Sequence, residues 1–178
     1  MSRLPTPATI EDAPTASRPM LDAVKKQLET GLTVGLESEL SIETAQMMHE
    51  MIPSAEIVRF SNSGTEANET AVQTARMHTG NFEILALRHG YSGRSSLARG
   101  LTGINTWRRA TIEVGIVHVM NPYCYRCPLS MTYPSCRMAC LDPIEQLLKA
   151  RHREIAGFVI EPLVQAAAGM IMSPPGYL

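Results

Sequence analysis

The feature that most constrains the fold is the string SNSGTEANE at residues 61–69. It follows an apolar, β-branched run at 56–60 and precedes a helix-like run at 66–79. A strand, a short Ser/Gly/Thr turn and a helix in this order direct free backbone N–H groups and the positive end of the helix dipole at one place. The string therefore predicts a phosphate-binding turn. The alternative is an ordinary helix start capped by Ser63 or Thr65.

Strand-like and helix-like segments alternate through the rest of the chain. Apolar runs predict strands at 56–60, 82–87, 116–120 and 157–160, and helical periods lie at 17–31, 40–52, 66–79 and 142–153. This alternation is typical of an α/β fold with a largely parallel sheet. Because the pattern ends without a closing helix, we expect part of a sheet and not a whole one. Residues 1–16 are rich in Pro, Thr and Ala and predict a mobile arm before a partial domain at 17–178.

Composition narrows the classes of partner. The 178 residues include 16 basic and 17 acidic side chains and are 44% hydrophobic. No basic stripe is visible, so nucleic acid and acidic membranes are not expected partners. No apolar run approaches the roughly 20 residues of a membrane helix, and the N-terminus shows no secretion signal. These features predict a soluble cytoplasmic protein.

The four cysteines lie close together in the sequence. Cys124, Cys127, Cys136 and Cys140 form the pattern C-x2-C-x8-C-x3-C in a Cys-rich loop at 122–140. The pattern is compatible with four thiolates around one zinc ion, and with a small zinc-binding interaction module. In a chain without a secretion signal, four reduced thiols and no metal are the interpretation we prefer.

Several ordered motifs resemble those of one enzyme family. The string at 61–69 is similar to the phosphate cup of class III (ω-type) aminotransferases, which use pyridoxal 5'-phosphate (PLP). The resemblance extends from about residue 18 to the end, through HGYSGRS at 89–95, PYCYRCPLSMTYPSC at 122–136 and FVIEPLVQAAAGM at 158–170. It implies a fragment of the large domain of PLP fold type I, a mostly parallel sheet flanked by helices, in a cytoplasmic homodimer. The implied reaction moves an amino group from an amino acid or amine to a 2-oxo acid.

The resemblance also assigns cofactor-binding residues. Gly64 and Thr65 would offer backbone N–H groups to the PLP phosphate, with Ser63 nearby. Tyr91 matches the aromatic residue that stacks on the pyridine ring, although a Tyr in a turn can equally pack on the sheet. Glu161 matches the carboxylate that lies near the cofactor ring, at the C-terminal end of a strand.

One residue is assigned to the substrate. Arg94 matches a position that meets the substrate carboxylate in several ω-aminotransferases, a contact that the planar guanidinium suits. A surface arginine in a polar turn is the alternative. The chain departs from the family at Ser92, where many members have His, and at Gln165, where some relatives place a second Glu nearby.

The catalytic residue of the family has no counterpart. The lysines of the chain are Lys25, Lys26 and Lys149, whereas the family's Schiff-base lysine follows the strand of Glu161. The N-terminal segment and the C-terminal domain of the family are not matched either. We therefore expect an aminotransferase fragment that is inactive alone. The alternative is a non-catalytic remnant that binds PLP or another phosphate.

Overall fold

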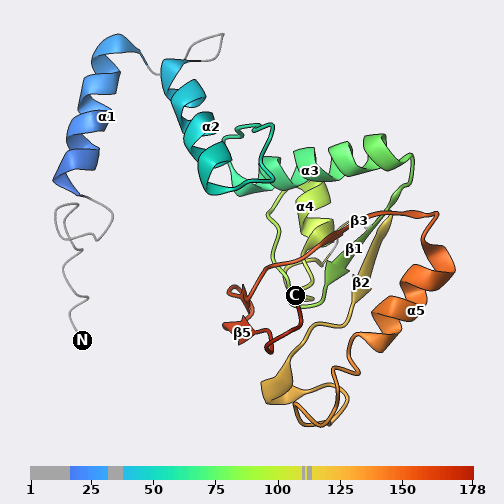
Figure 1. The fold of residues 1–178 in the computed structure, drawn as a ribbon. Coiled ribbons are helices and arrows are strands. Elements are labelled where there is room, and N and C mark those ends of the chain that lie inside the picture. The colour runs from blue at the N-terminus through green and yellow to red at the C-terminus, as the bar shows by residue number, and fades with distance from the viewer. Residues whose placement is uncertain (1–16, 32–37, 110, 112–113) are drawn as a thin grey trace. The chain divides into compact units, whose positions relative to one another are not determined.

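The computed structural model describes residues 17–31, 38–109, 111 and 114–178. The expected arm at 1–16 lies outside these residues. The chain divides into two compact units, Met1–Arg59 and Phe60–Leu178 (Figure 1).

The described residues of the first unit form two helices, as the sequence predicts. Helix α1 (Arg18–Thr30) follows Ser17 and ends at Gly31, whose φ of 108° favours glycine. Helix α2 (Glu39–Met51) begins with a capping box in which the Ser38 and Ser41 side chains bond each other's backbone N–H groups, at 3.2 and 3.0 Å. No helix among the described residues is long and apolar enough to cross a membrane.

The predicted strand at 56–60 is wrong. The structure shows an irregular segment there, and Ile57 is 93% exposed. A β-branched run becomes a strand only where a neighbouring strand accepts its backbone hydrogen bonds. Within the described part of the chain no strand pairs with this segment.

The second unit is built on a parallel sheet, which confirms the predicted fold class. Strand β1 (Glu83–Leu87) lies between β2 (Ile116–Val119) and β3 (Ile155–Val159), and both neighbours run parallel to it. The three observed strands overlap the predicted ranges at 82–87, 116–120 and 157–160. A two-stranded antiparallel hairpin, β4 (Val164–Gln165) and β5 (Ile171–Met172), follows β3.

Helices cover both faces of the sheet (Figure 1). Ile84 and Ala86 of β1 pack beneath α3 (Gly64–Thr79) and α4 (Ser96–Leu101). Leu85 and Leu87 point to the other face, beneath α5 (Asp142–Arg151). This alternation buries the central strand on both sides, as a parallel sheet requires. The two longer helices confirm the sequence prediction, whereas α4 and the 3₁₀ turn Cys124–Arg126 were not predicted.

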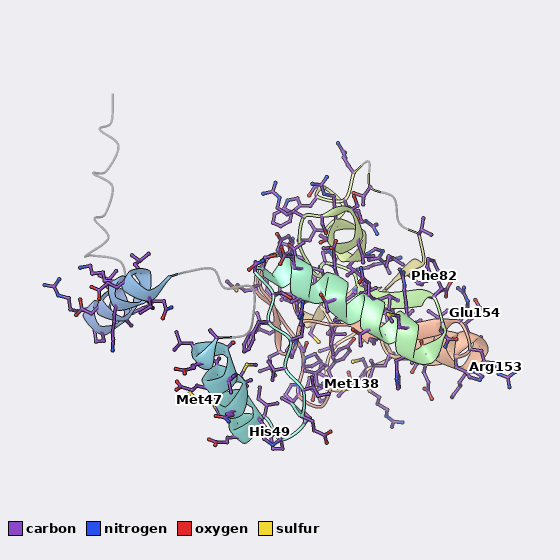
Figure 2. The ribbon with its side chains drawn as sticks, turned by 90° about the horizontal axis from the view of Figure 1, so that it is seen from above. Met47, His49, Phe82, Met138, Arg153 and Glu154 are labelled. Atoms are coloured by element: carbon purple, nitrogen blue, oxygen red, sulfur yellow. The ribbon has the colours of Figure 1, made fainter. Side chains whose placement is uncertain are left out.

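The parallel sheet has two opposite edges, and the end of α5 marks one of them. Arg151 at the end of α5 pairs with Glu83, the first residue of β1, and with Glu154 at 2.8 Å. Phe82 and Glu154 lie together at the same edge, where the Phe82 N–H donates to the Glu154 carbonyl at 3.2 Å (Figure 2). This is the amino edge of the sheet. The segments that follow β1, β2 and β3 all emerge at the opposite, carboxyl edge.

Candidate functional site

The first helical turn of α3 presents two backbone donors. The Ser63 hydroxyl accepts from the Glu66 N–H at 3.2 Å, and the Glu66 carboxylate accepts from the Asn62 N–H at 2.9 Å. These bonds leave the N–H groups of Gly64 and Thr65 without an acceptor among the described residues. No atom lies within 4 Å of the place that a Cβ on Gly64 would take. Two backbone donors at the positive end of a helix are therefore without a protein acceptor, and the space at the Gly64 Cβ position is open.

The loop at 89–95 packs directly on this turn. Gly93 has φ 130°, and a Cβ there would come within 2.4 Å of the Thr65 Oγ1 and 2.9 Å of the Ala98 Cβ. The Asn68 side chain donates to the Ser92 carbonyl at 2.8 Å. The start of α3 and the loop are therefore held in one fixed arrangement that carries Tyr91.

Glu161 connects the end of β3 to the same loop. One carboxylate oxygen accepts from the Tyr91 N–H at 2.7 Å, and the other accepts from the Ala166 N–H at 3.2 Å. The carboxylate, Asn68, Tyr91 and Ser92 border a cavity of about 150 Å³. Glu161 thus lies next to the predicted aromatic residue although 70 positions separate them in the sequence.

Arg94 borders a second and larger cavity beside Tyr91. This cavity has a volume of about 780 Å³, within the range of small-molecule sites. Tyr91 meets Trp107 edge to face, with ring centroids 5.4 Å apart, and remains 37% exposed. Tyr91 lines both cavities, so the structure brings the α3 turn, Tyr91, Glu161 and Arg94 to one region.

Sequence reasoning did not identify a buried polar chain behind this region. The Gln165 Nε2 donates to the Arg88 carbonyl at 3.1 Å, and the Asn121 Nδ2 donates to the Gln165 Oε1 at 2.9 Å. His89 Nδ1 lies 3.1 Å from the Asn121 Oδ1. Asn121 and Gln165 are only 3% and 1% exposed. These hydrogen bonds hold the segment after β3 against the ends of β1 and β2. A signal existed for Asn121, which comes two residues after a strand at the carboxyl edge.

The four cysteines gather at a different place. Cys124, Cys127, Cys136 and Cys140 are free thiols that border one narrow cavity of about 20 Å³. Burial raises the pKa of Cys124 and of Cys140, and the neighbouring thiols raise both further. No three His, Cys, Asp or Glu side chains in the described ranges are arranged to hold a metal ion. The structure gives the zinc interpretation no support.

None of the lysines described in the second unit reaches the candidate site. Lys149 pairs with Glu145 at 2.7 Å on the exposed side of α5. It lies two residues before Arg151, which is fixed to the first residue of β1 at the amino edge. The five residues of β1, at about 3.3 Å per residue, put the two edges roughly 15 Å apart. Lys25 and Lys26 belong to the other unit.

Comparisons with known proteins point to one family. Residues 16–178 match the family described as "Aminotransferase class-III". The adenosylmethionine-8-amino-7-oxononanoate aminotransferase of Geobacter sulfurreducens is 32% identical over 174 residues, which cover 90% of this chain and 38% of that protein. The glutamate-1-semialdehyde 2,1-aminomutase of Natranaerobius thermophilus is 33% identical over 161 residues, covering 88% of this chain and 34% of that protein.

Solved structures show the same fold. The thermostable (S)-enantioselective omega-transaminase from Thermomicrobium roseum superposes with a TM-score of 0.82 at 28% identity, covering 92% of this chain and 39% of that one. A Bacillus anthracis aminotransferase superposes with a TM-score of 0.78 at 27% identity, over 89% of this chain and 37% of that one. The chain therefore spans between 34% and 39% of the lengths of these four proteins.

Proposed function

The chain belongs to the class-III aminotransferase family, and from this premise we propose that it binds PLP and supplies part of an aminotransferase active site. The proposed reaction moves an amino group from an amino acid or amine to a 2-oxo acid. Bound PLP supplies the electron sink that such a transfer needs. The residues of this chain bind and orient it.

The observation that carries this proposal is the pair of unpaired N–H groups at Gly64 and Thr65. They lie at the start of a helix of 16 residues and have no acceptor among the described residues, an arrangement that suits a phosphate group. The Ser63 oxygen accepts one hydrogen bond and keeps its own proton to donate. Gly93 lies so close to Thr65 that the loop carrying Tyr91 stays beside this turn.

Tyr91 and Glu161 suit the aromatic part of the same cofactor. The partly exposed Tyr91 ring offers a flat surface against which a pyridine ring can lie. Each Glu161 oxygen accepts one backbone N–H and keeps a further lone pair for a polar group of the ring. We assign Arg94, which lines the larger cavity, to the substrate carboxylate.

A second candidate function applies to the polypeptide of 178 residues itself. Lys149 lies at the amino edge of the sheet, away from Tyr91 and Glu161. We therefore infer that this polypeptide binds PLP without transamination. Full turnover requires a lysine from sequence beyond these residues or from another polypeptide.

Assembly and location are further proposals. The family resemblance points to a homodimer, and the exposed apolar side chains Leu163, Met170 and Met172 beside the β4–β5 hairpin give a second subunit a surface to cover. Light scattering of the purified chain tests this, and a strictly monomeric chain would contradict it. Four free thiols suit the reducing cytoplasm, which cell fractionation tests.

The cofactor proposal can be tested by fluorescence, because Trp107 is the only tryptophan and touches Tyr91. Pyridoxine phosphate is the first probe, because it has no aldehyde to react with surface amines. We expect saturable quenching by pyridoxine phosphate and by PLP, and much weaker binding of pyridoxine. Equal affinity for pyridoxine and its phosphate would refute a phosphate site at Gly64 and Thr65.

Two variants test whether Tyr91 contacts the pyridine ring of the cofactor. Tyr91→Ala should weaken pyridoxine phosphate binding about fivefold, since aromatic pairs contribute roughly 1 kcal/mol. Tyr125→Ala is the control, because Tyr125 is 85% exposed and borders neither cavity at the proposed site. If the two variants bind equally well, Tyr91 does not contact the cofactor. In a transaminase assay we expect no turnover from the polypeptide of 178 residues.

A further inference from the structure

The 3₁₀ turn Cys124–Arg126 brings two of the four thiols to the same side of the backbone. Cys124 begins this turn and Cys127 follows it directly. Side chains three positions apart in a 3₁₀ helix eclipse each other, and at a rise of about 2.0 Å per residue their Cα atoms are roughly 6 Å apart. This separation lies within the range of about 4.4–6.8 Å between the Cα atoms of a disulfide.

Pro128 determines where this turn ends. Proline drives the residue before it from helical to extended backbone, and Cys127 has ψ 121°. Cys124 and Cys127 border the same cavity of about 20 Å³, which has room for no more than about one water molecule. Cys124 is exposed and Cys127 is half-buried, so Cys124 is the thiol that a reagent in solution meets first.

The residue before Cys124 anchors the turn on the folded core. The Tyr123 N–H donates to the Asn121 carbonyl at 3.0 Å, and the Tyr123 ring meets the His89 ring edge to face, with centroids 6.1 Å apart. The side chain of Asn121 is buried and bonded to Gln165. The fold thus limits the positions of the two thiols, and groups held close together react far faster than groups that meet by diffusion.

We propose that Cys124 and Cys127 form a reversible dithiol–disulfide site that exchanges with low-molecular-weight disulfides. The exposed Cys124 thiolate attacks one sulfur of the small disulfide, whose S–S bond breaks and releases one small thiolate. The Cys127 thiolate then attacks the Cys124 sulfur of this mixed disulfide and releases the second small thiolate. The two protein thiols are oxidised, the small disulfide is reduced to two thiols, and the two protons pass from the protein to these products.

The test treats the reduced, whole polypeptide with oxidised glutathione in the absence of denaturant. Burial raises the pKa of the Cys124 thiol, so a mildly alkaline buffer is used to increase its thiolate fraction. After an acid quench, alkylation and intact-mass measurement count the remaining thiols. We expect two of the four thiols to be lost without bound glutathione, and a reduced dithiol reagent to restore all four. Fragmentation mass spectrometry of the unchanged chain identifies the joined cysteines, so the assignment does not depend on how a variant folds.

Two variants and two controls separate the steps of the exchange. Cys127→Ser should stop it halfway, with one glutathione held on Cys124, and a merely structural role of Cys127 would not trap this mixed disulfide. Cys124→Ser should abolish the intramolecular disulfide. Cys136→Ser and Cys140→Ser are the matched controls, because these thiols border the same cavity but lie outside the 3₁₀ turn. Both control variants should form the disulfide as the unchanged chain does.

A disulfide that joins Cys124 to Cys136 or to Cys140 in the unchanged chain would overturn the inference. Four thiols that remain reduced would also overturn it, including the case in which elemental analysis shows that a bound zinc ion protects them. The same holds if Cys136→Ser prevents the disulfide as fully as Cys127→Ser does. No cofactor takes part in this assay, so none of these outcomes bears on the proposed PLP site.

Discussion

Replacing Gly64 with proline isolates the contribution of one backbone donor. Gly64 is the first residue of α3, a position that proline favours because its missing N–H would have no helical acceptor. The preceding Ser63 is extended, with φ −156° and ψ 158°, as a residue before proline should be. Nothing lies within 4 Å of the new Cβ, so the substitution removes a donor and its Cβ meets no neighbouring atom.

The two properties of this variant should change in opposite directions. A hydrogen bond to a charged group contributes about 1.5–3 kcal/mol, so loss of the Gly64 N–H should weaken phosphate-ester binding about 10- to 100-fold. Removing a glycine reduces the freedom of the unfolded chain, so the folded state should gain roughly 0.5–1 kcal/mol. A general loss of structure cannot produce this combination.

Gly64→Ala is the matched control. It adds the same Cβ and keeps the N–H, so binding should stay within about threefold of the unchanged chain while stability rises similarly. Calorimetric titration with pyridoxine phosphate measures the affinity, and urea unfolding measures the stability. Binding by Gly64→Pro that equals binding by Gly64→Ala would refute the donor role. An equal loss in both variants would show that space, and not hydrogen bonding, limits the site.

Three further predictions concern stability. Gly93→Ala should lower the free energy of unfolding by about 2 kcal/mol or more, because its φ is 130° and its Cβ would meet the Thr65 Oγ1 at 2.4 Å; urea unfolding that shows no loss would contradict the close packing of the two segments. Asn121→Leu and Gln165→Leu should each cost about 1–3 kcal/mol in the same assay, and the double variant less than their sum, because each single change leaves a buried amide unpaired; strict additivity would show that the two do not interact. Burial raises the pKa of Tyr177 to about 12 from 10.0. The folded chain therefore holds this proton more tightly than the unfolded chain, so the associated stability is intact below pH 10 and is lost as the pH rises to about 12. Tyr177→Phe should remove that part of the pH dependence, and an unchanged unfolding profile between these limits would refute it.

Much of the fold could be predicted because local patterns determine it. Residues 84–87 of β1 are a continuous apolar run, and α3 has a capping serine at one end and a glycine in the left-handed conformation at the other. The segment at 56–60 has an equally strand-like composition but remains irregular. A strand depends on its partner, and the sequence of the segment contains no information about the partner. Helix α4 was missed because six residues with an internal Gly100 give too short a pattern.

The location of the candidate site follows from one property of the sheet. Parallel strands end at the same edge, so polar residues that come directly after β1, β2 and β3 must lie close together. The sequence predicted Glu161 as a site residue because it lies in the segment at 158–170 that resembles the family. Asn121 was not predicted, because its partner Gln165 is 44 positions away and only the folded chain reveals the pairing.

The same property explains where Lys149 lies. A helix that connects parallel strands returns the chain to the amino edge, so the last residues of α5 end beside Glu83 and not beside Glu161. A lysine late in such a helix cannot reach the carboxyl edge, whatever its rotamer, because the strands themselves separate the two edges by roughly 15 Å. A reactive lysine for this site must lie in the segment directly after the C-terminal end of a strand. None of Lys25, Lys26 and Lys149 does so.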